Sequence, residues 1–315
     1  MAKTALVTGC AGFIGSNLVD HLLDKDYSVI GLDNFRTGIE ENLDSAMSNH
    51  NFRLIRADIL EEDLADFESD IDVIYHLAAV ASVKLSVEQP LLVHHSNATA
   101  TLKVLELARI NRIPRVVFSS SAAVYGRPEK LPVTEETPVY PLSPYGASKL
   151  AAEMYLRAYH HTHGIETVIL RYFNIYGPRQ AYTEYSGFIS IFINQALQDV
   201  PVTIDGDGKQ TRSLLYIEDI VDVTRRAGES ADTAGEILNV SGAKAISVLE
   251  IAERILALMP ESKSSIVHGD PRVGDVRESI GSDARIKEVL GFTPHVTLDE
   301  GLERTIDWYR RFHRT

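Results

Sequence analysis

Residues 4–16 read TALVTGCAGFIGS, an apolar run followed by three glycines, Gly9, Gly12 and Gly15. The apolar run predicts a β-strand from Thr4 to Thr8, and a helix is expected to begin near Phe13. Glycine permits a tight turn there, lets backbone amides approach a pyrophosphate and lets the helix pack closely on the strand. The helix N-terminus adds a partial positive charge that favours phosphate. This stretch therefore predicts a dinucleotide-binding turn.

Asp33 ends the next apolar run, roughly 20 residues further along the chain. A carboxylate at this distance accepts hydrogen bonds from the hydroxyls of the adenosine ribose. The same negative charge would repel the 2′-phosphate of NADP. We therefore expect the cofactor to be NAD.

Apolar runs alternate with helical patterns through the first 173 residues. This alternation predicts an α/β fold of the Rossmann type, a doubly wound parallel sheet with crossover helices. Two helices are expected, from Pro90 to Asn111 and from Pro144 to His163, the second capped by Ser143. The further strands are predicted to end at Asp33, Asp58, Ala78, Ser120 and Phe173.

Past Phe173 the pattern loosens into shorter elements, which predict a smaller C-terminal α/β region that binds substrate. We expect a division into residues 1–173, which bind the dinucleotide and carry the catalytic residues, and residues 174–315. No internal repeat or low-complexity linker separates the two, so they should share an extensive interface. Helices are predicted over 187–198, 217–229, 248–258 and 299–312, and strands over 201–204, 211–216 and 235–240.

The composition bounds the partners and the location. The 315 residues carry a formal net charge of −13, which argues against nucleic acid or an anionic membrane surface as a partner. No apolar stretch is long enough to span a membrane, and no export signal is apparent at the N-terminus, so a cytoplasmic location is expected. Cys10 is the single cysteine, which agrees with a reducing compartment.

Clusters of histidine raise the question of a metal site. His160, His161 and His163 fall at the end of a predicted helix, and His94 and His95 are adjacent. No nearby residues complete a ligand set, and histidine is favoured at helix C-termini by the helix dipole. We interpret them as solvated side chains and expect no metal.

Tyr145 and Lys149 lie four residues apart on a predicted helix, so they share one helix face. A chain of this size contains such pairs by chance, so the spacing alone proves little. The context carries the inference, because Ser119, Ser120 and Ser121 end a predicted strand just before this helix. Ligands of open α/β sheets bind at that carboxyl edge. We therefore predict the catalytic residues here.

Eight motifs spread over nearly the whole chain resemble the extended short-chain dehydrogenase/reductases, and among them the UDP-sugar 4-epimerases. They are TGCAGFIGS, DNFRTG, ADI, HLAA, SSSAAVYG, YGASK, RYFNIYGPRQ and RVGDVRES. The resemblance implies that Tyr145 is the acid/base, that Lys149 activates it and binds the nicotinamide ribose, and that Ser121 bridges Tyr145 and substrate. The implied cofactor-binding residues are Gly9, Gly12, Phe13, Ile14, Gly15, Asp33, Asn34, Asp58, Ile59, Leu77, Ala78, Ala79, Tyr145, Lys149 and Tyr172.

The chemistry of this set follows from charge. A tyrosine with its ordinary pKa near 10 is a poor base at neutral pH. An adjacent ammonium and a positive nicotinamide both favour the phenolate, and a shift of three units needs about 4 kcal/mol. The phenolate of Tyr145 would then remove the proton of a sugar hydroxyl while hydride leaves the same carbon for the cofactor.

The step that follows oxidation distinguishes the relatives. Sugar 4,6-dehydratases that resemble this chain carry an Asp-Glu pair after the catalytic hydroxyl, and decarboxylating relatives carry a glutamate in the same turn. Ala122 and Ala123 stand there instead. We therefore predict epimerisation at C4 with NAD regenerated in each cycle. A dehydratase, a keto-sugar reductase and a non-catalytic NAD-sensing module remain as alternatives.

Substrate recognition is also inferred from the resemblance. Asn174, Arg212 and Arg272 match positions that contact the uridine diphosphate, and arginine forks suit phosphate oxygens. Arg179 is either a further contact or a surface charge. Ser279 replaces a bulky residue and leaves space for an N-acetyl group, so UDP-GlcNAc and UDP-GalNAc are expected beside UDP-glucose and UDP-galactose.

Two points stay open at this stage. UDP-glucuronate epimerases often carry a basic residue just after GPRQ, where this chain has Ala181 and Tyr182, which disfavours a uronate without excluding it. The helices predicted from Pro90 and from Pro144 form a homodimer bundle in relatives. Leu102, Leu105, Leu150 and Met154 would suit that seam or would face the sheet.

Overall fold

The computed structural model describes residues 2–61, 70–181, 187–271 and 277–312. Over these ranges a seven-stranded parallel sheet has the order β10-β6-β5-β4-β1-β2-β3. The strand order reverses between β1 and β4, which defines the switch point where ligands of open α/β sheets bind. The strands are β1 Thr4–Thr8, β2 Ser28–Asp33, β3 Phe52–Arg56, β4 Val73–His76, β5 Arg115–Ser121, β6 Glu166–Tyr172 and β10 Ile237–Val240. The predicted α/β fold with a parallel sheet is confirmed.

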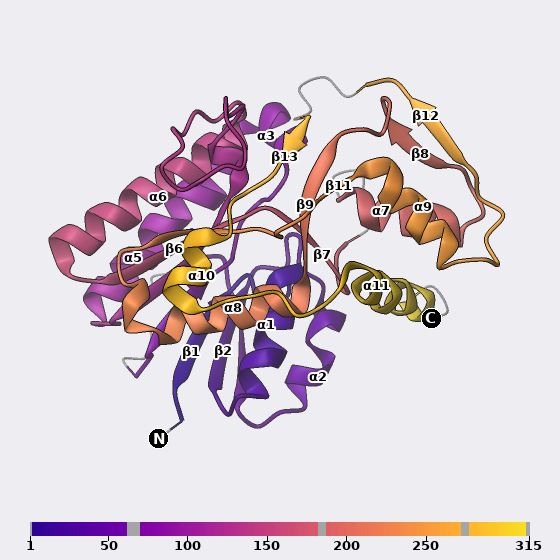
Figure 1. Cartoon of the computed structure of the whole chain (residues 1–315). Helices are drawn as coiled ribbons and strands as arrows, with labels where there is room; N and C mark the ends of the chain where they lie inside the picture. Colours follow the sequence, from indigo (N-terminus) through magenta and orange to yellow (C-terminus); the bar gives the residue numbers. More distant parts are fainter. Residues whose placement is uncertain (1, 62–69, 182–186, 272–276, 313–315) are drawn as a thin grey trace.

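Helices cover both faces of this sheet (Figure 1). Alternate side chains of β1 show why, since Val7 packs in the core cluster of one face and Leu6 in that of the other. The Val7 face is covered by α1 Phe13–Leu23 and α8 Ile217–Glu229, with the short α2 Asp44–Met47 beside them. The Leu6 face is covered by α5 Ala100–Ile110 and α6 Pro144–His163.

The helix predicted from Pro90 to Asn111 is interrupted. It consists of α4 Pro90–His94, a π-helical turn His95–Thr99 and α5. A π-turn adds a residue to the helix and redirects side chains. Here Asn97 is turned inward, where its amide side chain pairs with the backbone of Val80 at 2.8 and 3.2 Å. The interruption therefore ties this helix to the loop that follows β4. The helix α3 Val83–Glu88 was not predicted.

Helix α6 has the predicted bounds, Pro144–His163. The Ser143 hydroxyl accepts a hydrogen bond from the Gly146 amide at 3.1 Å, so the predicted N-cap is present. Gly164 ends the helix with a φ of +70°. This capping fixes the start of α6, and with it Tyr145 and Lys149, at the carboxyl edge of β5.

The C-terminal part forms a smaller α/β region beside the main sheet (Figure 1). At its centre β9 Thr211–Tyr216 pairs with β7 Asn174–Tyr176, β11 Ala245–Ser247 and β13 Glu278–Ser279. A separate pair joins β8 Val202–Asp205 to β12 Ile266–Gly269. The helices of the region are α7 Phe188–Leu197, α9 Val248–Ala257 and α11 Leu298–Phe312, whereas α10 Ala284–Leu290 packs on β10 and α8 of the main sheet.

The chain returns to the main sheet after entering this region. Strand β10 pairs with β6, and α8 packs on α1 in the core of the first region. Residue 173 therefore marks where the chain first leaves the sheet, while residues 217–240 go back to it. The predicted division between residues 173 and 174 stays a prediction. The return of residues 217–240 means that the main sheet also includes part of the second segment.

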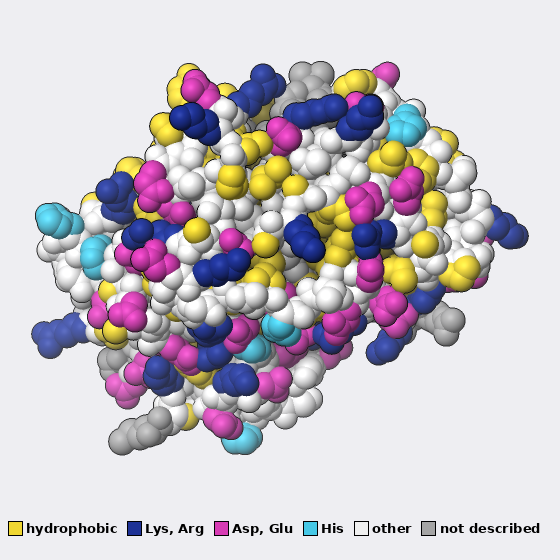
Figure 2. Space-filling view, viewed as in Figure 1, with side chains coloured by type: hydrophobic (Ala, Val, Ile, Leu, Met, Phe, Trp, Pro, Cys, Tyr) yellow, Lys and Arg dark blue, Asp and Glu magenta, His cyan; other side chains and the backbone are white. Residues whose placement is uncertain are grey.

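The surface carries charged side chains of both signs. Figure 2 shows acidic and basic side chains interspersed over the visible face. Among the helices of the described ranges, none has the length and apolar content that a bilayer crossing requires.

Candidate active site

The turn after β1 needs glycine at two positions. Gly9 has a φ of +70°, and a Cβ there would lie 2.7 Å from the Ala78 amide nitrogen. A Cβ on Gly15 would lie 2.0 Å from the Gly9 carbonyl oxygen, so helix α1 could not sit this close to the turn with any other residue. The backbone cradle predicted from the sequence is thus built as expected at the N-terminus of α1, where Phe13 and Ile14 begin the helix.

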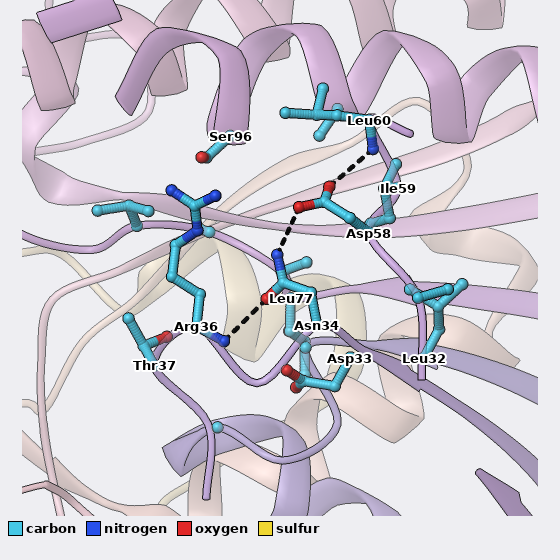
Figure 3. A pocket seen from close by; sticks show the side chains of 17 residues that line it. Leu32, Asp33, Asn34, Arg36, Thr37, Asp58, Ile59, Leu60, Leu77 and Ser96 are labelled. Carbon is cyan, nitrogen blue, oxygen red and sulfur yellow. Dashed lines mark hydrogen bonds between the residues drawn. The ribbon is translucent and has the colours of Figure 1, made fainter. Parts of the chain in front are cut away.

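A pocket opens at the switch point, at the ends of β1, β2, β3 and β4 (Figure 3). The empty space inside it is about 640 Å³, including the part open to solvent. Of the predicted cofactor residues, Gly9, Gly12, Asp33, Asn34, Asp58, Ile59, Leu77, Ala78 and Ala79 line it. Residues not predicted also line it, namely Leu32, Arg36, Thr37, Ala57, Leu60, Val80, Ser96 and Ala100.

Asp33 holds the floor of this pocket. Its two carboxylate oxygens accept the amides of Ala11 and Phe35, each at 2.8 Å, which joins the glycine turn to the loop after β2. Each oxygen keeps a further lone pair for a ribose hydroxyl. The position therefore suits the predicted role while also fixing the two loops.

Asp58 is held at the opposite wall. It accepts the Asn34 side-chain amide at 2.7 Å and the Leu60 backbone amide at 2.9 Å. The Arg36 side chain points across the pocket toward Ser96 (Figure 3). Arg36 lies inside the DNFRTG motif, so the sequence held a signal for it. Ser96 comes from the π-helical turn, and no pattern marked it.

The three residues predicted for catalysis lie at the carboxyl end of β5. The Lys149 ammonium donates to the Ser119 carbonyl oxygen at 2.8 Å and lies 4.8 Å from the centre of the Phe118 ring. Burial lowers the pKa of Lys149 to about 7, and the Glu153 carboxylate partly opposes this shift. The Ser121 hydroxyl is hydrogen-bonded to the Tyr145 phenol. The structure thus places Ser121 beside Tyr145, and Lys149 one helical turn further along α6 against β5.

The electrostatics of Tyr145 differ from the expectation. Burial raises the pKa of Tyr145 above its usual value, and the hydrogen bond from Ser121 opposes the rise in part. The predicted lowering relied on an ammonium together with a positive nicotinamide ring. In this structure the Lys149 ammonium binds a backbone carbonyl instead. The chain's own groups therefore favour the neutral phenol.

Tyr172 was predicted to contact the cofactor, and the structure places it elsewhere. Its side chain lies in the core on the α8 face, and its hydroxyl pairs with Thr224 at 2.7 Å. Successive strand residues point to opposite faces, so Phe173 turns toward the α6 face, where its ring lies 6.4 Å from that of Tyr125.

Strand β9 gathers three of the predicted substrate residues. Arg212 pairs in register with Ser279, and the Asn174 side-chain amide donates to the Ser213 carbonyl at 3.1 Å and to the Ser279 hydroxyl at 3.4 Å. Arg179 instead donates to Asp20 of α1 at 2.6 Å, so it has a structural partner. The predictions for Arg272 and Tyr182 concern positions outside the described residues.

This fold, with a glycine turn and a pocket at the switch point, defines a nucleotide-binding α/β protein. Residues 5–241 match the model of the NAD dependent epimerase/dehydratase family. The chain therefore belongs to this family of extended short-chain dehydrogenase/reductases and is an NAD-dependent enzyme of that group.

Three similar proteins show how the family varies. The chain is 39% identical to a UDP-glucose 4-epimerase of Mycolicibacterium smegmatis over 97% of its own length and 98% of the relative's. It superposes with a TM-score of 0.94 and 34% identity on a UDP-N-acetylglucosamine 4-epimerase of Methanobrevibacter ruminantium, covering 99% of both chains. A UDP-glucuronic acid 4-epimerase of Bacillus cereus, solved with UDP-glucuronic acid and NAD, gives a TM-score of 0.90 and 35% identity over 98% and 99% of the two chains.

The residues of this chain fit NAD. The close approaches at Gly9 and Gly15 leave the turn free of side chains, and Asp33 faces the pocket with acceptor capacity for a ribose. When bound, NAD supplies the acceptor and donor of a hydride.

Proposed function

We propose that this protein is a 4-epimerase of UDP-hexoses that works through a transient 4-keto sugar. The observation that carries the proposal is the turn after the catalytic serine. Ser121 ends β5, and residues Ala122–Val124 form the 3₁₀ turn that follows. Dehydratases that resemble this chain have an acid and a base at Ala122 and Ala123. Methyl groups there leave the turn without a group that could remove water from the keto sugar.

The residues of the site divide the work. The Tyr145 phenolate, which a bound positive nicotinamide would favour, takes the proton of the C4 hydroxyl, with Ser121 bridging Tyr145 and the sugar, and the phenol so formed later returns that proton to the keto oxygen. Lys149 holds the end of β5 through Ser119 and orients the ribose beside it. Asn174 and Arg212 hold the uridine diphosphate, so the hexose rotates within the site without dissociating. Bound NAD would supply the acceptor and donor of the C4 hydride, and its return to the opposite face of the keto sugar would invert C4.

The breadth of substrates rests on Ser279. Its small side chain lies on β13, next to Asn174 and in register with Arg212. A small residue here leaves space for an acetamido group at C2. We therefore extend the proposal to UDP-GlcNAc and UDP-GalNAc, and the 34% identical UDP-N-acetylglucosamine 4-epimerase supports it. The similar UDP-glucuronic acid 4-epimerase keeps UDP-glucuronate as the second candidate.

The test is direct. Purified protein is incubated separately with UDP-glucose, UDP-GlcNAc and UDP-glucuronate, and the products are resolved by chromatography. Epimers of the first two without net reduction of NAD are the expected result. Epimerisation of UDP-glucuronate alone would identify the second candidate, a 4-keto product would indicate a dehydratase, and net NAD turnover would indicate a keto-sugar reductase. Cofactor binding with no turnover of any sugar would instead favour an NAD-sensing module.

We also propose a homodimer through α3, α4 and α6. Leu105 packs in the core, which agrees with the alternative that it faces the sheet, whereas Met154 is 44% exposed. The neighbouring helices α3 and α4, which contact α6, expose Val87 by 65% and Leu91 by 73%. Apolar exposure on this scale on adjacent helices favours burial against a second copy. Light scattering of the purified protein tests this, and a monomeric mass would contradict it.

A further inference from the structure

A buried ion pair lies one helical turn beyond Lys149. Glu153 is fully buried, and its carboxylate accepts two hydrogen bonds from the Arg171 guanidinium, at 2.7 and 3.0 Å, and one from the Ser120 hydroxyl. Arg171 is 3% exposed. A buried ion pair is weak evidence for stability, because desolvation offsets most of its attraction. The presence of this ion pair in the core therefore indicates a role other than stabilising the fold.

The pair continues into a chain of hydrogen bonds. Arg171 donates to the Tyr125 hydroxyl at 2.8 Å, and its guanidinium lies 4.8 Å from the centre of that ring. The Tyr125 hydroxyl donates to the Asn239 side-chain oxygen at 2.7 Å. Tyr125 is 2% exposed and Asn239 is fully buried. Both hydrogen-bonding capacities of the Tyr125 hydroxyl are thus used between two elements far apart in the sequence.

The hydrogen bonds end on the residues that directly follow β13, the strand that carries Ser279. The Asn239 amide donates to the Val133 carbonyl at 3.0 Å. That carbonyl also accepts the Ser282 amide at 2.7 Å, and the Val133 amide donates to the Ile280 carbonyl at 2.8 Å. Gly281 lies against Phe173 so closely that a Cβ would come within 2.5 Å of that ring. Residues 280–282 are therefore clamped directly after β13.

We propose that Glu153, Arg171, Tyr125 and Asn239 form a positioning chain that sets the place of Ser279 and β13 relative to Tyr145 and Lys149 on α6. None of the four touches the reacting atoms. They act by joining the catalytic helix to the segment beside the sugar, so that phenol and hexose meet at one distance. This inference rests on the proposed function for the identity of the substrate.

The variant Tyr125→Phe tests the positioning chain, because it removes the hydroxyl that joins Arg171 to Asn239 and keeps the aromatic ring. Tyr27→Phe is the matched control. Tyr27 is 4% exposed, and its hydroxyl donates to the charged Glu229 at 2.7 Å at the far edge of the sheet, just before β2. Both variants lose one buried hydroxyl bonded to a charged partner. They differ in whether that hydroxyl joins α6 to β13.

Two readouts are taken on each variant. Hydrogen exchange is expected to speed up at the Val133 and Ser282 amides in Tyr125→Phe and to stay at the wild-type rate in Tyr27→Phe. With the UDP-sugar that the wild type epimerises, KM should rise about twofold to thirtyfold in Tyr125→Phe, the range of coupling carried by such networks. Its kcat should change less, because Tyr145 and Ser121 remain in place.

The outcomes separate this inference from the proposed function. Exchange rates and KM values that match in the two variants would overturn the positioning chain, even if both variants are equally destabilised. A wild type that epimerises no UDP-sugar would overturn the proposed function, and the exchange rates alone would then decide the coupling. A selective effect in Tyr125→Phe supports the chain.

Discussion

The cofactor half and the substrate half of this site are built in different ways. The cofactor half uses loops that follow β1, β2, β3 and β4, and its contacts are largely made by backbone atoms of the glycine turn and by Asp33. The substrate half uses Asn174, Arg212 and Ser279, which come from three strands that meet at β9. The cofactor half depends on motifs that are short stretches of the sequence. The substrate half forms only when segments far apart in the sequence pack together.

The largest expected effect lies between the two halves. Tyr145→Phe removes the phenol that pairs with Ser121 and so removes general acid/base catalysis, which contributes about 10² to 10⁴-fold. Epimerase turnover should fall by that factor while NAD stays bound. Turnover is measured by chromatography, and bound NAD is released by denaturation and quantified. Wild-type turnover in the variant would remove Tyr145 from the mechanism.

The cofactor half can be broken through its backbone. Gly15→Ala places a Cβ 2.0 Å from the Gly9 carbonyl, so α1 must move away from the turn. We expect a loss of about 3 kcal/mol in the free energy of unfolding, the upper part of the range for overpacking, together with weaker NAD binding. Gly269→Ala is the control, because its Cβ would make an ordinary contact at 3.4 Å. Urea denaturation measures both variants, and equal stability would contradict the tight cradle.

The free energy of unfolding is expected to depend on pH through a buried histidine near the cofactor half of the site. His76 is fully buried between Thr8 and Thr101, and burial lowers its pKa to about 3, with a smaller contribution from Lys149. As pH falls below 6.5 the unfolded chain binds a proton at this histidine and the folded chain does not. The free energy of unfolding should therefore drop by about 1.4 kcal/mol per pH unit, or about 2 kcal/mol between pH 6.5 and 5.

The measurement compares urea denaturation of wild type and His76→Gln at pH 7 and pH 5. The variant is expected to lack this share of the loss between the two pH values. His50→Gln, at an exposed position, should keep the wild-type dependence. An unchanged dependence in His76→Gln would show that the loss comes from other groups.

The smallest effect is expected in the substrate half. Arg212→Lys keeps the charge on β9 and loses the planar fork that suits a diphosphate. We expect about a tenfold weaker affinity for UDP, equal to 1.4 kcal/mol, with NAD binding unchanged. Arg277→Lys is the control, because Arg277 is already paired with Asp207 at the surface. Calorimetric titration with UDP reads out both, and equal affinities in the two variants would argue against Arg212 as a phosphate ligand.

The features that were predicted correctly depend on residues close together in the sequence, and those that were missed depend on how the chain packs. The strand–glycine–helix pattern predicted β1 and α1, and the cap at Ser143 predicted the start of α6, because these features depend on residues close together in the chain. Tyr172 was assigned to the cofactor because the motif does not show which face of β6 each side chain takes. Ser96 was missed because it reaches the pocket through a π-helical turn that no periodicity marks.

From the residues alone, the Rossmann-type sheet, the NAD-dependent family and the Tyr145–Lys149 pair on one helix face could be inferred, since hydrophobic period, glycine spacing and capping act over a few residues. Packing alone decided that β10 and α8 return to the first sheet, that Arg179 pairs with Asp20 and that Glu153 is joined to Asn239. Those contacts join segments far apart in the sequence, such as Asp20 and Arg179, which are 159 residues apart. Side-chain burial and hydrogen bonding choose such partners after the chain has collapsed, so no local pattern records them.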